Sequence, residues 1–161
     1  MTHERIMNLG ITYAQKTMME NIGGPFGAVI TKESDDGQND VIAVSSNHVI
    51  ANNDPTAHAE VMAIREACKK LGTYDLSGYT LYATSEPCPM CLAAIIWANI
   101  KTVYYGCTAK DAADIGFRDD YIYKYIEDGC SDDNVLKMIP SSRNKCIQLF
   151  DTYAAMNKII Y

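Results

Sequence analysis

The sequence predicts an α/β fold in which helices cover both faces of a mixed β-sheet. Three observations predict it: a length of 161 residues, alternating β-rich and helical segments after residue 55, and Asp-Gly turn chemistry between two early β-rich runs. A chain of this length can bury a core of its own, so we expect one domain over residues 1–161. Strand–helix–strand crossovers make parallel neighbours, whereas the early hairpin makes an antiparallel pair.

The first elements are expected to be a helix and a hairpin. Apolar residues recur at three- and four-residue spacing over residues 4–21, which is typical of an amphipathic helix. The β-rich runs 26–31 and 41–45 are separated by a polar stretch containing Asp36-Gly37, a pair typical of hairpin turns. These runs therefore predict two antiparallel strands.

The next helix is expected over residues 55–71. Asp54 is suited to an N-cap, Pro55 to the first helical position and Gly72 to the stop. The core face of this helix is expected to comprise Val61, Met62, Ile64, Ala67 and Cys68.

The rest of the chain predicts two strands and several helices. Residues 79–84 and 101–106 are β-rich, and residues 89–99 between them are apolar nearly all round, which predicts a buried helix. Shorter helices are expected at 110–113 and 120–127. A last helix is expected over 142–158, with an apolar face made of Cys146, Leu149, Phe150 and Tyr153.

Charge and cysteine usage restrict the class of protein. Fourteen basic and twenty acidic residues give a net charge of −6, which disfavours nucleic acid as a partner, and no stretch is suited to span a membrane. The chain begins without a secretory pattern, so we expect a cytoplasmic protein with reduced thiols. Four of the six cysteines are expected to be small buried hydrophobes: Cys68, Cys107, Cys130 and Cys146.

Two short motifs carry the chemistry. His58 and Glu60 form a His-x-Glu pair, and Cys88 and Cys91 form a Pro-Cys-x-x-Cys motif thirty positions later. Structural zinc usually takes four protein ligands, whereas catalytic zinc keeps three and leaves one position for water. His58, Cys88 and Cys91 are therefore expected to hold one zinc ion per subunit, and a thiolate-rich set favours zinc over iron.

The remaining carboxylate, Glu60, indicates the reaction. Zinc lowers the pKa of a bound water towards 7, and a nearby carboxylate can move the proton of this nucleophile to a ring nitrogen and then to a leaving amine. This order of motifs is the signature of zinc nucleobase deaminases. The alternative is a closed structural site that uses His48 or another cysteine as fourth ligand, but it leaves Glu60 without a role.

The sequence resembles the cytidine deaminase-like superfamily of CMP/dCMP-type zinc deaminases and, within it, the bacterial guanine deaminase branch. The runs that carry this resemblance are Gly-Gly-Pro-Phe-Gly-Ala-Val-Ile at 23–30, Asn-Asp-Pro-Thr-Ala-His-Ala-Glu at 53–60, Glu-Pro-Cys-Pro-Met-Cys at 86–91, Asp-Ala-Ala-Asp-Ile-Gly-Phe at 111–117 and Tyr-Ile-Tyr-Lys at 121–124. The zinc motifs mark the superfamily only, whereas Gly116-Phe117 and the terminal Tyr161 mark the guanine branch.

The resemblance implies a three-layer αβα sandwich with a mixed five-stranded sheet. It also implies hydrolysis of guanine to xanthine and ammonia in purine catabolism, and a homodimer in which a C-terminal segment of about 110–161 is exchanged between subunits. Asp119 would recognise the purine or assist proton transfer. The substrate-binding residues would be Phe26, Asn47, Ala57, Trp97 and Tyr161.

Each of these residues also has an ordinary structural interpretation. From pattern alone, Phe26 and Trp97 suit a core, Asn47 a turn, Asp119 a solvated face and Tyr161 a frayed terminus. Three other functions share the motifs: a tRNA adenosine deaminase, a cytosine-type pyrimidine deaminase and a non-catalytic zinc-stabilised binding module. A tRNA substrate fits the net charge of −6 poorly.

Overall fold

The computed structural model describes residues 1–35 and 37–161, so Asp36 of the expected hairpin turn lies outside the described residues. The chain divides into two compact units, Met1–Tyr123 and Lys124–Tyr161. No helix among the described residues is long and apolar enough to cross a membrane.

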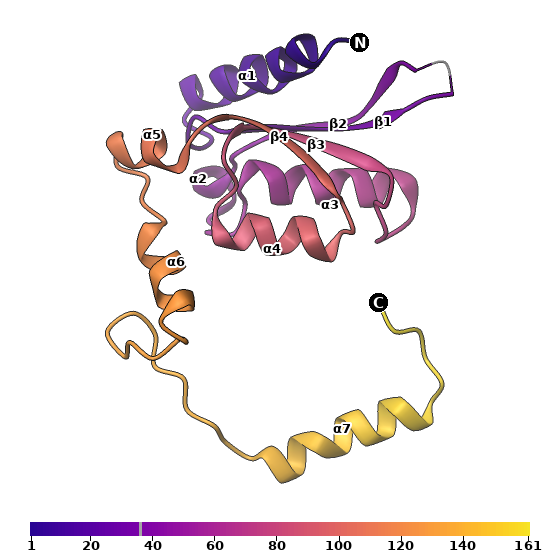
Figure 1. Cartoon of the computed structure of the whole chain (residues 1–161), viewed down its shortest axis with the longest axis vertical. Coiled ribbons are helices and arrows are strands. Elements are labelled where there is room, and N and C mark those ends of the chain that lie inside the picture. The colour runs from indigo at the N-terminus through magenta and orange to yellow at the C-terminus, as the bar shows by residue number, and fades with distance from the viewer. Residues whose placement is uncertain (36) are drawn as a thin grey trace. The chain divides into compact units, whose positions relative to one another are not determined.

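The first unit is built on a four-stranded mixed sheet (Figure 1). Strand order is β2-β1-β3-β4: β1 pairs antiparallel with β2 and β3, whereas β3 and β4 run parallel. The strands are β1 (Gly27–Glu33), β2 (Asn39–Ser46), β3 (Tyr79–Ser85) and β4 (Thr102–Cys107). All four strands predicted from the sequence are confirmed. The described residues contain no fifth strand of the sheet, so the five-stranded expectation is corrected to four.

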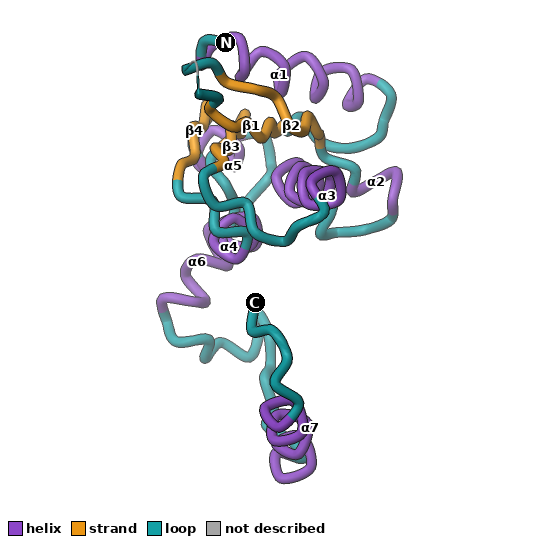
Figure 2. The backbone as a smooth tube through the Cα atoms, turned by 90° about the vertical axis from the view of Figure 1, so that its right-hand side faces the viewer, coloured by secondary structure: helices purple, strands orange, loops and turns teal. Residues whose placement is uncertain are grey.

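Helices cover both faces of this sheet, as the fold class requires (Figure 2). Helix α1 (His3–Met19) covers one face, where Ile6 packs with Val29 and Tyr82. Helices α3 (Ala59–Leu71) and α4 (Pro89–Trp97) cover the other. The larger core, which includes Ile30, lies on that side.

Helix α3 begins four residues later than predicted. The Asp54 carboxylate accepts hydrogen bonds from the backbone N–H and the hydroxyl of Thr56, at 2.8 and 2.7 Å, so it closes a local turn and does not cap a helix at Pro55. His58 is the N-cap instead, with extended backbone angles of φ −67° and ψ 155°. The expected stop is confirmed, because Gly72 ends the helix in the left-handed region at φ 68°.

Two expectations about burial need correction. The expected face of α3 is confirmed at Ala67, which is buried, and at Ile64 and Cys68, which pack against the core. The fully buried stripe, however, is made of small residues four apart, Ala59, Ala63 and Ala67, whereas Val61 and Met62 are only partly buried. Small residues allow the helix to lie close to the sheet. Helix α4 is not buried all round: Leu92, Ile96 and Trp97 are 41%, 61% and 73% exposed, because only one side of the helix packs on the core.

The remaining helices lie between and after these elements. Helix α2 (Val49–Asn52) was not expected, whereas α5 (Ala109–Asp114) and α6 (Asp120–Glu127) match the short helices predicted. Three of the four cysteines expected to be buried are exposed, because Cys107 lies on the end strand β4 and Cys130 and Cys146 lie in the second unit, which buries little surface.

The second unit contains helix α7 (Arg143–Ala155) and the C-terminal tail. The Tyr153 hydroxyl donates a hydrogen bond of 2.6 Å to the Ile159 carbonyl, which folds the tail back along the helix. Leu149, Phe150 and Tyr153 of the predicted face, together with Ile160 and Tyr161, line an apolar groove of about 530 Å³.

Candidate metal centre and active site

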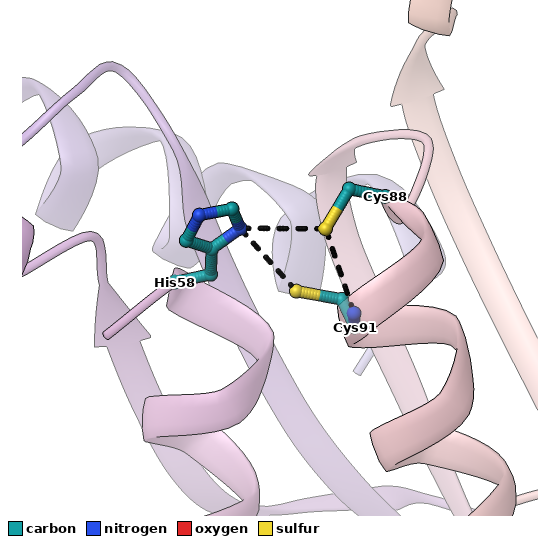
Figure 3. Close-up of side chains that lie close together, drawn as sticks. All are labelled: His58, Cys88 and Cys91. Atoms are coloured by element: carbon teal, nitrogen blue, oxygen red, sulfur yellow. Dashed lines mark hydrogen bonds between the residues drawn. The ribbon is translucent and has the colours of Figure 1, made fainter. Parts of the chain in front are cut away.

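The three expected metal ligands lie together at the beginnings of two helices (Figure 3). His58 is the N-cap of α3, and Cys88 is the N-cap of α4, where Pro89 follows at the first helical position. Cys91 lies in the first turn of α4 and is fully buried. Residues 58 and 88, far apart in sequence, are therefore brought together because α3 and α4 begin at the same place.

The distances fit a tetrahedral zinc ion. Nδ1 of His58 lies 3.5 Å from Sγ of Cys88 and 3.5 Å from Sγ of Cys91. A tetrahedral zinc ion with bonds of about 2.3 Å to sulfur and about 2.0–2.1 Å to nitrogen places those ligands roughly 3.5 Å apart. One nitrogen and two sulfur donors are also the ligand types that zinc prefers.

The group contains three ligands among the residues that the structure describes, and no fourth His, Cys, Asp or Glu joins it there. Nδ1 of His48, the histidine considered as a fourth ligand, lies 2.8 Å from the Ser46 carbonyl oxygen instead. The arrangement is that of an open site, which leaves a coordination position for water or substrate.

The pKa values of the two thiols are shifted in opposite directions. A hydrogen bond from Cys91 lowers the pKa of Cys88, whereas the same hydrogen bond, together with burial, raises the pKa of Cys91. A coordinating metal ion would hold both sulfurs as thiolates.

Glu60 lies beside the metal group without belonging to it. It occupies the first turn of α3, and only 7% of its surface is exposed. Burial raises the pKa of its carboxyl, and its negative charge contributes to the raised pKa of Cys91. A buried carboxyl with a raised pKa next to an open metal site is suited to accept and return a proton.

Asp119 lies close enough to the ligands for its charge to interact with them. Its carbonyl accepts hydrogen bonds from the N–H groups of Ile122 and Tyr123, so it marks the beginning of α6. Burial raises the pKa of its carboxyl, and Cys88 contributes to the shift. Asp119 also contributes to the raised pKa of His58, after a larger effect of Cys88. These mutual effects place its carboxylate within electrostatic range of the ligands.

Phe26 and Asn47 lie at the adjoining ends of β1 and β2. The Phe26 ring meets the Phe117 ring edge to face, with centroids 5.0 Å apart. The Asn47 side-chain carbonyl accepts hydrogen bonds from the N–H groups of Gly24 and Val49, at 3.3 and 3.1 Å, which fixes the orientation of its amide. A side chain at Gly23 would collide with the Asn47 backbone carbonyl, so this approach requires glycine.

Ala57 links this region to the metal ligands. It is fully buried, and its carbonyl accepts a hydrogen bond of 2.9 Å from the N–H of His48. That bond ties the loop carrying Asn47 to the residue preceding His58.

Two of the sequence-predicted residues are not placed with this group. Trp97 ends α4 and is 73% exposed, so its interpretation as a core residue is wrong. Tyr161 belongs to the second unit, where it lines the apolar groove beside α7.

The structure adds residues that were given no role from sequence. Phe117 packs on Phe26, and the Tyr123 hydroxyl donates a hydrogen bond of 3.0 Å to the Pro87 carbonyl, next to Cys88. The pair Gly116-Phe117 marks the guanine deaminase branch in the sequence, so the sequence does point to Phe117. Tyr123 lies in the run 121–124 that also carries the resemblance, but no local pattern predicts its bond to Pro87, 36 positions away.

Comparisons with known proteins agree with this geometry. The chain is 52% identical over 127 residues to guanine deaminase of Bacillus subtilis (strain 168), covering 79% of this chain and 78% of that protein. It is 40% identical over 105 residues to a tRNA-specific adenosine deaminase of Buchnera aphidicola, covering 65% and 66%. The X-ray structure of Bacillus subtilis guanine deaminase superposes with a TM-score of 0.89, at 41% identity, covering 100% of this chain and 99% of that one.

The protein-family model of the cytidine and deoxycytidylate deaminase zinc-binding region matches residues 1–107. This range includes His58, Glu60, Cys88 and Cys91, so the donor set described above is the zinc centre of the family, with one zinc ion per chain. The chain belongs to the cytidine and deoxycytidylate deaminase family of zinc enzymes.

Proposed function

We propose that this protein is a guanine deaminase, which hydrolyses guanine to xanthine and ammonia. The observation that carries the proposal is an open three-ligand zinc group with the buried Glu60 beside it. Its substrate is inferred from the 52% identity to Bacillus subtilis guanine deaminase.

Zinc, when bound, lowers the pKa of a water molecule towards 7 and so supplies a nucleophile at neutral pH. Glu60 accepts a proton from this water and delivers it to the purine ring nitrogen beside C2. It would then take the second proton of the same water oxygen, now bonded to C2, and pass it to the amino group, which leaves as ammonia. The water oxygen stays on C2, so guanine and water give xanthine and ammonia in balance.

The proposed base site lies between the metal group and the Phe26–Phe117 pair. Phe26 packs against the base, and Phe117 supports that ring edge to face. All hydrogen bonds that the structure gives to the Asn47 side chain end on Oδ1, so Asn47 can offer its Nδ2–H to an acceptor on the purine edge. Ala57, fully buried directly before His58, forms part of the floor. Trp97 is left out of this site, because it lies at the opposite end of α4 from Cys88.

Asp119 is proposed as the acceptor for purine N–H groups, or as a second carrier of protons. Its partly buried position beside Cys88 supports this assignment, because a carboxylate there lies close to the reacting part of the base. The solvated alternative fits less well, since burial is the main cause of its raised pKa.

We propose that the enzyme is a homodimer and that a C-terminal segment is exchanged between its subunits. Apolar side chains of that segment, including Leu149 and Phe150, are exposed in the single chain. Its boundary is set more narrowly than the expected 110–161, at residues 124–161, since the second unit begins at Lys124. In this arrangement Tyr161 completes the base site of the partner. Light scattering on the purified protein tests the dimer.

The cytoplasm is the proposed location, because the zinc site needs Cys88 and Cys91 as reduced thiols. No disulfide joins cysteines among the described residues. Guanine is a product of nucleotide breakdown, so the proposed role is in purine catabolism.

A tRNA adenosine deaminase is the main alternative, because a relative with that name is 40% identical over 105 residues. Proteins that hold nucleic acid rely on clustered positive charge, whereas this chain carries a net charge of −6. A cytosine-type deaminase would use the same zinc chemistry on a smaller ring. A non-catalytic zinc module leaves the buried Glu60 without a role.

Zinc-loaded protein incubated with guanine tests the proposal. We expect xanthine and ammonia in equal amounts, measured by absorbance and by an enzymatic ammonia assay. The absence of turnover in protein carrying one zinc per chain would exclude guanine as the substrate.

A further inference from the structure

Phe117 and Asp119 lie on the segment 108–123, which follows β4. Glu86 binds the beginning of this segment to the loop that carries Cys88. The carboxylate of Glu86 accepts a hydrogen bond of 2.9 Å from the N–H of Ala109, the first residue of α5. The N–H of Glu86 also donates a hydrogen bond of 2.8 Å to the Cys107 carbonyl. The start of the segment is therefore fixed to the residue two positions before Cys88.

The other end is fastened by Tyr123. Its hydroxyl, which is partly buried, donates a hydrogen bond of 3.0 Å to the carbonyl of Pro87, the residue directly before the ligand Cys88. Helix α4 begins only at Pro89, so the Pro87 carbonyl lies outside that helix and accepts from the phenol.

Tyr123 and Asp119 belong to one helical turn. The Asp119 carbonyl accepts hydrogen bonds from the N–H of Ile122 at 3.0 Å and from the N–H of Tyr123 at 3.3 Å. Burial raises the pKa of Tyr123, and the charges of Asp119 and Glu86 add to the effect; all three residues are partly buried. Because the hydrogen bond from the Tyr123 N–H joins it to the Asp119 carbonyl, a shift of Tyr123 away from Pro87 would carry Asp119 with it.

We propose that Tyr123 is a positioning residue, which holds Asp119 beside the metal ligands through its hydrogen bond to the Pro87 carbonyl. This inference rests on the proposed function, since it assigns Tyr123 its effect through Asp119. Displacing a substrate-positioning group by about 1 Å costs roughly 10²-fold in rate. One phenol hydroxyl is thus expected to have a measurable effect on turnover although it never contacts the base.

The matched variants are Tyr123→Phe and Tyr121→Phe. Both remove one hydroxyl from α6, but Tyr121 is 53% exposed, whereas Tyr123 is anchored to Pro87. We expect Tyr123→Phe to lower kcat/KM for guanine by about 10- to 100-fold, with zinc content and Tm equal to those of Tyr121→Phe. Wild-type kcat/KM in Tyr123→Phe would overturn the inference.

A double-mutant cycle with Asp119→Asn tests whether Tyr123 acts through Asp119. Residues that act through one another give non-additive losses. Adding Tyr123→Phe to Asp119→Asn should therefore change kcat/KM less than about twofold, while a loss as large as in the wild-type background would contradict the inference.

Hydrogen exchange measured by mass spectrometry tests the anchor without any substrate. Tyr123→Phe should speed amide exchange in residues 108–123 relative to Tyr121→Phe and leave residues 1–107 unchanged. Unchanged exchange in 108–123 would refute the anchoring. If the wild type fails to turn over guanine, the proposed function fails, whereas the exchange experiment still decides whether Tyr123 fixes this segment.

Discussion

Nδ1 of His58 lies 3.5 Å from Sγ of Cys88, although thirty positions separate the two residues. Each residue is the N-cap of its helix, His58 of α3 and Cys88 of α4. Both helices therefore direct the positive ends of their dipoles at the metal group, where they favour thiolate ligands and a bound anion. The relationship links local capping to metal chemistry, and several predictions depend on it.

Glu60→Gln should retain zinc and lose activity. The amide has nearly the shape of the carboxylate but cannot accept the proton, so kcat for guanine should fall by about 10²–10⁴-fold. Metal analysis checks that zinc is retained, and steady-state kinetics check that activity is lost. Activity near that of the wild type in a zinc-loaded variant would show that another group carries the proton.

Cys91→Ala should lose the metal and much of the stability that it confers. Removing one of three ligands weakens binding, and a ligand at 1,000 times its Kd stabilises the folded state by about 4 kcal/mol. Zinc per chain and Tm are the measurements. Cys107→Ala, at an exposed position, is the control and should keep both values. A Cys91→Ala protein with wild-type zinc content would contradict the ligand assignment.

Phe117→Ala should weaken substrate binding more than it weakens the fold. An edge-to-face aromatic pair contributes about 0.5–1.5 kcal/mol, so KM for guanine should rise by about 2- to 13-fold with a smaller change in kcat. Ile115→Ala, 64% exposed on the same segment, is the matched control. Equal rises in KM for the two variants would remove Phe117 from the base site.

Asp75 should make the stability depend on acid pH. Its carboxylate accepts hydrogen bonds from the hydroxyl and the N–H of Ser77 and from the Asn99 amide, and the Ser77 hydroxyl is the main cause of its lowered pKa. Because the folded-state pKa lies below the unfolded value, this stabilisation is present above about pH 4 and is lost as the pH falls through the folded-state pKa.

Melting curves of wild type and Asp75→Ala from pH 7 to pH 3 measure this effect. The difference in Tm should be largest at neutral pH and shrink in acid. Ser77→Ala removes the main donor and should reproduce part of the same pH dependence. A difference in Tm that stays constant with pH would mean that the Asp75 carboxylate contributes packing and not charge.

The metal group was predictable from sequence because its signals are local. The spacing of Cys88 and Cys91 and the Pro89 that opens α4 are both visible in a short window, and the structure brings His58 to them. The beginning of α3 was mispredicted because it also depended on a local signal, and that signal was misleading. Asp54 followed by Pro55 is typical of a helix start, but the Asp54 carboxylate bonds to Thr56 and closes a turn.

Contacts between distant segments were not predictable in this way. Hydrophobic periodicity indicated the apolar character of α4 but not which side faces the core, so the exposure of Ile96 and Trp97 was missed. The bond from Tyr123 to Pro87 joins a helix to a loop 36 positions earlier, and it depends on how the segment after β4 returns over the zinc loop.

The most direct test of the central claim is a comparison of kcat/KM of the zinc-loaded protein across guanine, cytosine, adenine, cytidine, guanosine and a tRNA anticodon stem-loop. Ammonia release measured for each substrate at one pH and one salt concentration gives a common scale. The account predicts that guanine is deaminated with the highest kcat/KM and that the stem-loop yields no inosine. Inosine formation in the stem-loop, with guanine left intact, would contradict it.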